Sequence, residues 1–213
     1  MRRCLPDVGH YDKGRNMLNM NIVIAAVGGQ GALLASRILG TLAQELQYDV
    51  KVSEVHGMSQ RGGSVVAFVR FGEKVYSPVV EKGSADVILG FERLEAARYV
   101  DYLKEGGALI MNTQCINPMP VITGQMAYPV NLMKDLGKLN IKVAAVDALQ
   151  LAKESGNIKA VNVALLGAMA GLFDIDQNIW IKAIRKNVPV KFADVNLKAF
   201  EAGYAFTSSL VLK

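Results

Sequence analysis

The stretch from Glu54 to Val66 reads EVHGMSQRGGSVV and carries polar side chains well suited to binding a ligand. Gln60 and Arg61 lie between Gly57 and the Gly62-Gly63 pair, with strand-like runs on both sides. Glycine permits positive φ and close approach, so a ligand or a partner chain could lie directly against this loop. Glycine-rich connections between strands are also commonly plain turns. The candidate substrate- or partner-facing residues are His56, Ser59, Gln60, Arg61, Gly62 and Gly63.

Two roles are open for Arg61. Its planar guanidinium could pair with a carboxylate or a phosphate, in a geometry that lysine reproduces poorly. Alternatively, it bonds the carbonyls of its own loop and supports an interface. The neighbouring His56 is the only histidine after residue 10, and alone it is more typical of a hydrogen-bonding loop residue than of a general base.

A second candidate is the turn Gly28, Gly29, Gln30 and Gly31, a cofactor-binding or cleft-facing site. It joins a continuous apolar strand at 21–27 to a helix at 32–46 with an apolar stripe, and a strand–turn–helix unit points backbone N–H groups toward an anion. Residues 26–31 read AVGGQG, which is not the dinucleotide pattern GxGxxG, and Ala32 and Leu33 exclude a phosphate-binding GxxxxGK[ST]. A tight structural turn is the simpler interpretation.

Side chains for independent catalysis are missing from the sequence. There is no Ser/His/Asp order, no HExxH, no GxSxG and no second histidine in the body of the chain to complete a zinc site. Cys4 and Cys115 lie far apart and form no CxxC, so neither a disulfide framework nor a metal or iron–sulfur site is indicated. We therefore predict no catalytic residue and no metal ligand in this chain.

Three further polar residues have a structural and a functional interpretation. Glu92 and Glu95 could form a catalytic pair, but in the first turn of a helix they more simply cap it or remain solvated. Asn162 lies in the apolar helix expected at 159–171, where hydrogen-bond satisfaction is a simpler role than ligand contact. Glu54 is a weak candidate for the acidic ribose-binding position of a nucleotide site.

Composition limits the class of protein. With 213 residues and 51% hydrophobic residues the chain can bury a core, and we expect one α/β domain at 20–213 after a disordered tail or mis-called start at 1–19. The net charge of +5 is spread out, which does not favour nucleic-acid binding. No apolar run reaches membrane-spanning length and no signal peptide is evident, so a soluble, cytoplasmic protein is expected.

The order of the expected elements indicates an α/β fold. Strands are predicted at 48–55, 64–71, 85–90, 108–111 and 141–147, with a hairpin into 75–77 and a possible short strand near Val121. Helices are predicted at 91–103, 130–139, 148–154, 176–184 and 196–204. The hairpin makes the expected sheet mixed and not purely parallel.

Several motifs together resemble one family. The sequence is similar to the gamma-type domain of the 2-oxoacid:ferredoxin oxidoreductases over roughly residues 20–205, and its loop is most similar to that of the beta subunits of indolepyruvate-specific members. Ala26 is a departure, because relatives often have glycine there. The resemblance rests on VGGQG at 27–31, HGMSQRGG at 56–63, ADVILGFERLEA at 85–96 with Arg98, and Asn162 ahead of Leu166-Gly167.

The resemblance implies a three-layer α/β/α sandwich with a mixed, mainly parallel sheet. It also implies a subunit, inactive alone, of an enzyme that converts a 2-oxo acid to an acyl-CoA and reduces ferredoxin. Thiamine diphosphate and [4Fe–4S] clusters would be held by the large (alpha) subunit, with CoA as a substrate. Because such a subunit alone would expose its apolar partner-facing surface, we expect the isolated chain to form a homodimer. The alternatives are a gamma subunit for pyruvate or 2-oxoglutarate and a stand-alone nucleotide-binding module.

Overall fold

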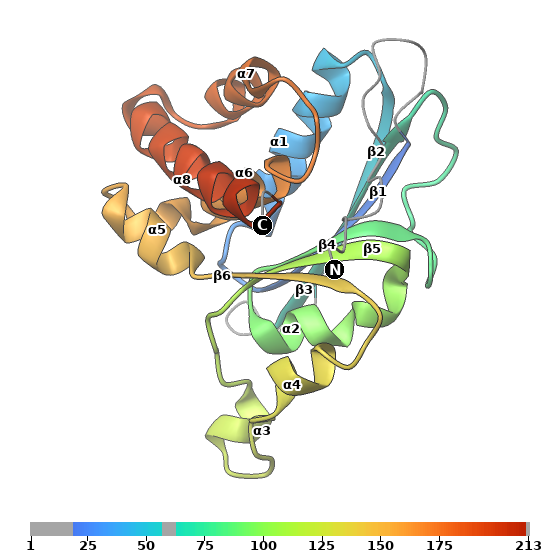
Figure 1. Ribbon diagram of the computed structural model, residues 1–213, viewed down its shortest axis with the longest axis vertical. Coiled ribbons are helices and arrows are strands. Elements are labelled where there is room, and N and C mark those ends of the chain that lie inside the picture. Colours follow the sequence, from blue (N-terminus) through green and yellow to red (C-terminus); the bar gives the residue numbers. More distant parts are fainter. Residues whose placement is uncertain (1–18, 57–62, 212–213) are drawn as a thin grey trace.

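The computed structural model describes residues 19–56 and 63–211 (Figure 1). The predicted tail at 1–19 therefore lies, except for Asn19, outside the described residues. The strands are β1 Met20–Val27, β2 Asp49–His56, β3 Ser64–Gly72, β4 Ala85–Gly90, β5 Leu103–Asn112 and β6 Lys142–Val146. The helices are α1 Ala32–Glu45, α2 Arg93–Arg98, α3 Met119–Ile122, α4 Leu132–Leu136, α5 Ala148–Glu154, α6 Val161–Ala170, α7 Gln177–Asn187 and α8 Ala193–Val211. Short 3-10 turns are η1 Val100–Tyr102, η2 Ile158–Ala160 and η3 Val190–Phe192.

The strands form one sheet in the order β2-β3-β1-β4-β5-β6. β3 pairs antiparallel with both β1 and β2, whereas β1, β4, β5 and β6 run parallel to one another. From Ile22 to Val27 every residue of β1 is buried, as expected for a central strand covered on both faces. The predicted mixed, mainly parallel sheet is confirmed.

Helices cover the sheet on both faces (Figure 1). α1 and α5 to α8 pack on one face, where Ile22 and Ile24 of β1 join a large apolar cluster that includes Trp180 and Phe200. α2 and α4 cover the other face, where Val23 of β1 joins a smaller cluster. The two clusters follow from the alternation of side chains along β1. The three-layer α/β/α architecture is confirmed.

α6 and α8 pack with their backbones in contact. A Cβ added at Gly167 of α6 would lie 2.0 Å from the carbonyl oxygen of Phe200, and one added at Gly203 of α8 would lie 2.0 Å from the carbonyl oxygen of Ala164. α6 is buried at every position from Asn162 to Ala170. The prediction of a closely packed apolar helix is therefore confirmed for this segment, which begins with η2.

The prediction of a hairpin after β3 is wrong. Residues 75–77 form no strand, because β3 lies between β1 and β2 and both of its edges are already paired. The backbone N–H of Val75 instead donates to Asp49 Oδ2 at 3.0 Å. The mixed character of the sheet comes from the antiparallel placement of β3 and not from the expected hairpin.

Two other expectations fail in the region between β4 and β6. The helix expected to reach Leu103 ends at Arg98, because the ring of Tyr102 packs on Tyr99 and on the sheet residue Phe68, with centroids 5.6 and 6.0 Å away. The short strand expected near Val121 is instead helix α3, whose N-terminal end contains Pro118 as N-cap and Pro120, positions at which a missing N–H costs no helical bond.

Candidate functional site

The carboxyl ends of β1, β4 and β5 meet at one edge of the sheet. After β1 the chain adds β2 and β3 on one side, and later it adds β4 to β6 on the other, so the chain order changes direction between β1 and β4. Ligands of open α/β sheets bind outside the carboxyl ends of the strands at such a switch point. The glycine turn follows β1 here, and α2 follows β4, so this edge is the candidate site.

Gln30 holds the glycine turn together from within. The backbone N–H of Val27 donates to Gln30 Oε1 at 2.7 Å, and Gln30 Nε2 donates to the carbonyl oxygen of Phe91 at 3.0 Å. Gly29 and Gly31 adopt φ of +94° and +86°, which only glycine takes without strain. The backbone N–H of Gly28 donates to the carbonyl oxygen of Gly63 at 2.9 Å. The turn is thus joined to β4 and to the end of the 57–63 loop.

Asn162 closes the turn on the side of α6. Its Nδ2 donates to the carbonyl oxygen of Gly31 at 3.3 Å, and its Oδ1 accepts from the backbone N–H of Val163 at 2.9 Å. A Cβ at Gly31 would lie 2.5 Å from Asn162 Nδ2. The predicted structural role of Asn162 is confirmed, and this contact explains the glycine at position 31.

The polar loop is described only at its ends. His56 is the last residue of β2 and pairs with Val65 of β3, whereas Ser59, Gln60, Arg61 and Gly62 lie outside the described residues. Of the predicted loop residues, Gly63 alone is placed in contact with the glycine turn, through its carbonyl oxygen. The roles proposed for the other loop residues stay predictions.

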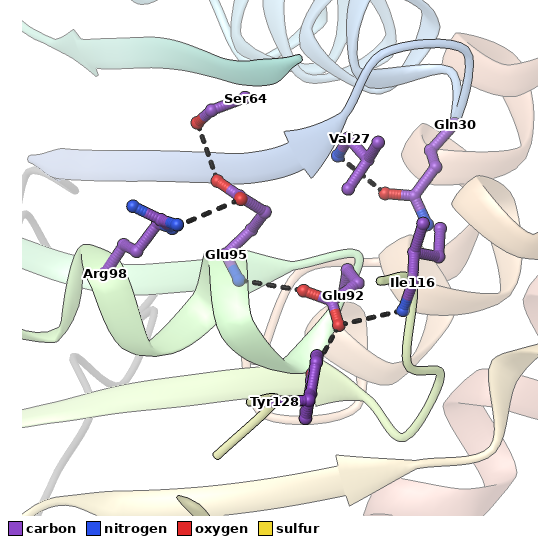
Figure 2. A network of polar contacts seen from close by, with 8 residues as sticks. All are labelled: Val27, Gln30, Ser64, Glu92, Glu95, Arg98, Ile116 and Tyr128. Carbon is purple, nitrogen blue, oxygen red and sulfur yellow. Dashed lines mark hydrogen bonds and ion pairs between the residues drawn. The ribbon is translucent and has the colours of Figure 1, made fainter. Parts of the chain in front are cut away.

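Glu92 is a buried carboxylate that joins three segments (Figure 2). It is 1% exposed, and its Oε2 accepts from the backbone N–H of Glu95 at 2.9 Å. Glu92 therefore caps α2, which is one of the two structural roles predicted for it. Its Oε1 accepts from the backbone N–H of Ile116 at 3.1 Å and from the hydroxyl of Tyr128 at 2.6 Å. Burial, followed by the Glu92 hydrogen bond, raises the pKa of Tyr128 well above its usual range, so the phenol stays a donor.

Glu95 is also buried, at 5% exposure, so of the two predicted alternatives, capping or a solvated side chain, the solvated one is wrong for both carboxylates. Its Oε2 accepts from the hydroxyl of Ser64, the first residue of β3, at 2.6 Å. Arg98 Nε lies 3.3 Å from Glu95 Oε1. A buried carboxylate is tolerated because such partners replace the lost water. Figure 2 shows that Glu92 and Glu95 extend from α2 toward different segments.

The sequence interpretation missed several polar residues at this edge. Asn112 Nδ2 donates to the carbonyl oxygen of Phe91 at 3.2 Å, and Gln114 Oε1 accepts from both Asn112 and Gln30, at 3.3 and 3.4 Å. Arg93 contacts the exposed thiol of Cys115. One sequence feature could have identified them, because these residues directly follow the apolar runs of β4 and β5. Tyr128 has no such signal, because its segment has no periodic pattern.

Among residues 19–56 and 63–211 no group of three or more His, Cys, Asp or Glu side chains is arranged to hold a metal ion. No helix in the part of the chain that the structure describes is both long and apolar enough to cross a membrane. Glu54, the candidate for a ribose contact, accepts instead from the Ser36 hydroxyl of α1 at 2.8 Å.

Residues 21–206 match the family described as pyruvate ferredoxin/flavodoxin oxidoreductase, and the chain belongs to this family. It is 48% identical over 192 residues to the indolepyruvate oxidoreductase subunit IorB of Thermococcus kodakarensis, across 88% of this chain and 95% of that one. It is 46% identical over 194 residues to IorB of Pyrococcus horikoshii, with the same shares covered. The family resemblance predicted from the motifs is confirmed.

A solved structure supports the fold. The gamma subunit of a keto/oxoacid ferredoxin oxidoreductase from Geobacter sulfurreducens aligns with 89% of this chain and 99% of its own, with a TM-score of 0.66 and 24% identity. At this identity the likeness bears on architecture alone, and it agrees with the three layers described above.

Proposed function

We propose that this chain is the small subunit of a cytoplasmic oxidoreductase that converts indolepyruvate, an arylpyruvate, to an acyl-CoA and transfers the electrons to ferredoxin. The identity to two IorB subunits along nearly their whole length carries the proposal. The chain has two cysteines, fewer than the four thiolates that a [4Fe–4S] cluster requires. In the proposal, thiamine diphosphate and the clusters are held by the large subunit, and CoA is a substrate of the complex.

In this assembly the switch-point edge faces the large subunit. The backbone of Gly28 in the glycine turn bonds Gly63, the residue at which the loop at 56–63 ends, so the loop ends against the surface of the turn. We place substrate or cofactor contacts on this surface, with Arg61 as the cation that pairs with a substrate carboxylate or a CoA phosphate.

A second feature supports a large partner. No residue from 106 to 133 is charged, although this range includes the exposed helix α3 and the residues that lead from it to α4. Met126 is 66% exposed and Val130 is 91% exposed. Exposed apolar side chains without charges are typical of surfaces that a partner covers. Without the large subunit we expect this chain to self-associate, most simply as a symmetric homodimer, and sedimentation at micromolar concentration tests this.

Co-expression with the large subunit tests the function. The two chains together should reduce ferredoxin or a viologen dye only when both indolepyruvate and CoA are present. Pyruvate and 2-oxoglutarate measured in parallel test the other members of the family, and a preference for either by kcat/KM would reassign the substrate. Full activity from this chain alone would refute the proposal that the large subunit holds thiamine diphosphate and the clusters.

A further inference from the structure

Gln114 lies two residues after β5 and completes a network of side-chain amides at the switch-point edge. Its Oε1 accepts from Gln30 Nε2 of the glycine turn at 3.4 Å and from Asn112 Nδ2 at 3.3 Å. The amide of Gln30 is oriented by the backbone N–H of Val27, which donates to Gln30 Oε1 at 2.7 Å (Figure 2). The amide of Asn112 is oriented in the same way by the backbone N–H of Ala148, at 3.2 Å from Asn112 Oδ1. The nitrogen of each amide is therefore the donor that faces Gln114.

The same two amide nitrogens share the carbonyl oxygen of Phe91, the residue that follows β4. Gln30 Nε2 donates to this oxygen at 3.0 Å, and Asn112 Nδ2 donates to it at 3.2 Å. A side-chain amide nitrogen carries two N–H groups, and a buried N–H group without an acceptor is costly. Phe91 accepts one N–H from each amide, so Gln114 Oε1 is the acceptor for the second N–H of both.

The backbone at Gln114 is itself held from two sides. The N–H of the preceding residue, Thr113, donates to the carbonyl oxygen of Val146 at the end of β6, at 2.9 Å. The N–H of Arg93, the first residue of α2, donates to the carbonyl oxygen of Gln114 at 3.2 Å. The side chain of Gln114 therefore extends from a fixed backbone, and its oxygen joins the glycine turn after β1 to the segments that follow β4 and β5.

We propose that Gln114 is a positioning residue, which acts through Gln30 to hold the glycine turn in the shape that the assembled enzyme uses. The proposal rests on the function proposed above, in which this turn contributes substrate or cofactor contacts. Gly29 and Gly31 have no side chains that could restrain the turn, so its shape depends on the bonds of Gln30. A displacement of about 1 Å can cost two orders of magnitude in rate, so a positioning contact of this kind has a measurable effect on turnover.

Gln114→Met in the assembled complex is the main test, because methionine is unbranched and of similar length but lacks the amide oxygen. Normalised to complex isolated by gel filtration, kcat/KM for the 2-oxo acid should fall at least tenfold. Gln150→Met is the matched control and should match the unaltered chain. Gln150 is exposed on α5, and its Nε2 donates to Glu154 of the same helix at 2.8 Å. A purely structural role of Gln114 would change the yield of complex and not its kcat/KM.

A second measurement uses the full chain alone and does not depend on activity. The backbone N–H of Val27 donates to Gln30 Oε1, so its hydrogen-exchange rate reports how firmly Gln30 is held. Gln114→Met should raise this rate several-fold, whereas Gln114→Glu, which keeps an acceptor oxygen on a side chain of the same length, should not.

Three results would overturn the positioning role. They are unchanged exchange in Gln114→Met, an equal rise in Gln114→Met and Gln114→Glu, and unchanged kcat/KM in the Gln114→Met complex. An unaltered complex that is inactive on every 2-oxo acid refutes the proposed function instead, and the exchange rates still decide whether Gln114 holds the glycine turn.

Discussion

The two helical layers of this protein are built differently. On one face α6 and α8 are long and apolar, and Gly167 and Gly203 allow their backbones to touch. On the other face α2 and α4 have only 6 and 5 residues, and two buried carboxylates at the start of α2 hold the neighbouring segments. The first layer is held by close packing, and the second depends to a greater extent on directional hydrogen bonds.

Because of this difference, substitutions in the two layers should affect different properties, folding stability in one and assembly or turnover in the other. Close packing is sensitive to added volume, and its loss affects folding as a whole. Hydrogen-bonded segments that leave apolar side chains exposed, such as Met126, contribute less to the core and are available to a partner. Substitutions in the α6–α8 layer should therefore lower the free energy of unfolding, whereas substitutions at the α2–α4 side and its edge should change assembly or turnover.

The largest expected effect is on turnover, from Arg61→Lys. If the guanidinium pairs with an anionic group of the substrate or CoA, the complex should lose about 2–4 kcal/mol in kcat/KM, because lysine cannot form the bidentate contact. Steady-state kinetics of the reconstituted complex measure this, with the thermal midpoint as the control for folding. Normal assembly with unaltered turnover would assign the arginine to loop structure.

The next largest effect is expected on the free energy of unfolding, from Gly203→Ala in α8. Helix propensity alone predicts a gain of about 1 kcal/mol, but the added Cβ would lie 2.0 Å from the carbonyl oxygen of Ala164, so we expect a net loss of about 2 kcal/mol. Gly40→Ala in α1 is the matched control, because its Cβ would meet Val52 at an ordinary 3.7 Å. Chemical denaturation should give opposite signs, and the same sign for both would show that α6 and α8 can separate at little cost.

A smaller effect is expected on assembly, from Met126→Asp. The substitution places a charge in a segment without charges, so burial against the large subunit should weaken the complex at least tenfold, or about 1.4 kcal/mol. Tyr76→Asp is the control, since Tyr76 is 88% exposed but lies outside this segment. Titration of the large subunit measures both. Equal affinities for the two variants would place the partner elsewhere.

The sequence predicts β1 and α1 well, because the pattern that defines each of them lies within the element itself. β1 and α1 begin and end within one residue of the predicted bounds, because a buried strand needs a continuous apolar run and a helix needs an apolar stripe. The hairpin after β3 fails for a non-local reason. Its turn signal is present, but β3 has no free edge, and this depends on where β1 and β2 pair.

The candidate site likewise has a part that the sequence predicts and a part that it does not. The glycine turn is visible in the sequence because positive φ requires glycine at positions 29 and 31. The partners that complete it are not visible. Gln30 bonds a carbonyl 61 residues later in the chain, and Tyr128 bonds a carboxylate 36 residues earlier. Such pairs form only when the fold brings distant segments together, so no local sequence pattern predicts them.

The smallest expected effect comes from Glu45, which joins α1 to α7 beside the tightly packed layer. Hydrogen bonds first from Lys182 and then from Lys186 hold the pKa of Glu45 below its ordinary value. A carboxyl with a lowered folded-state pKa stabilises the protein above the unfolded-state pKa, about 4.3 for glutamate, and this contribution is lost as pH falls through the folded-state value. Glu45→Gln should therefore lower stability slightly at neutral pH and make little difference once the carboxyl is protonated. Denaturation from pH 7 to pH 3 in low salt measures this, with the exposed Glu105→Gln as the control, and added salt should reduce the difference. A difference that persists at pH 3 would mean that the side chain acts through its packing and not through its charge.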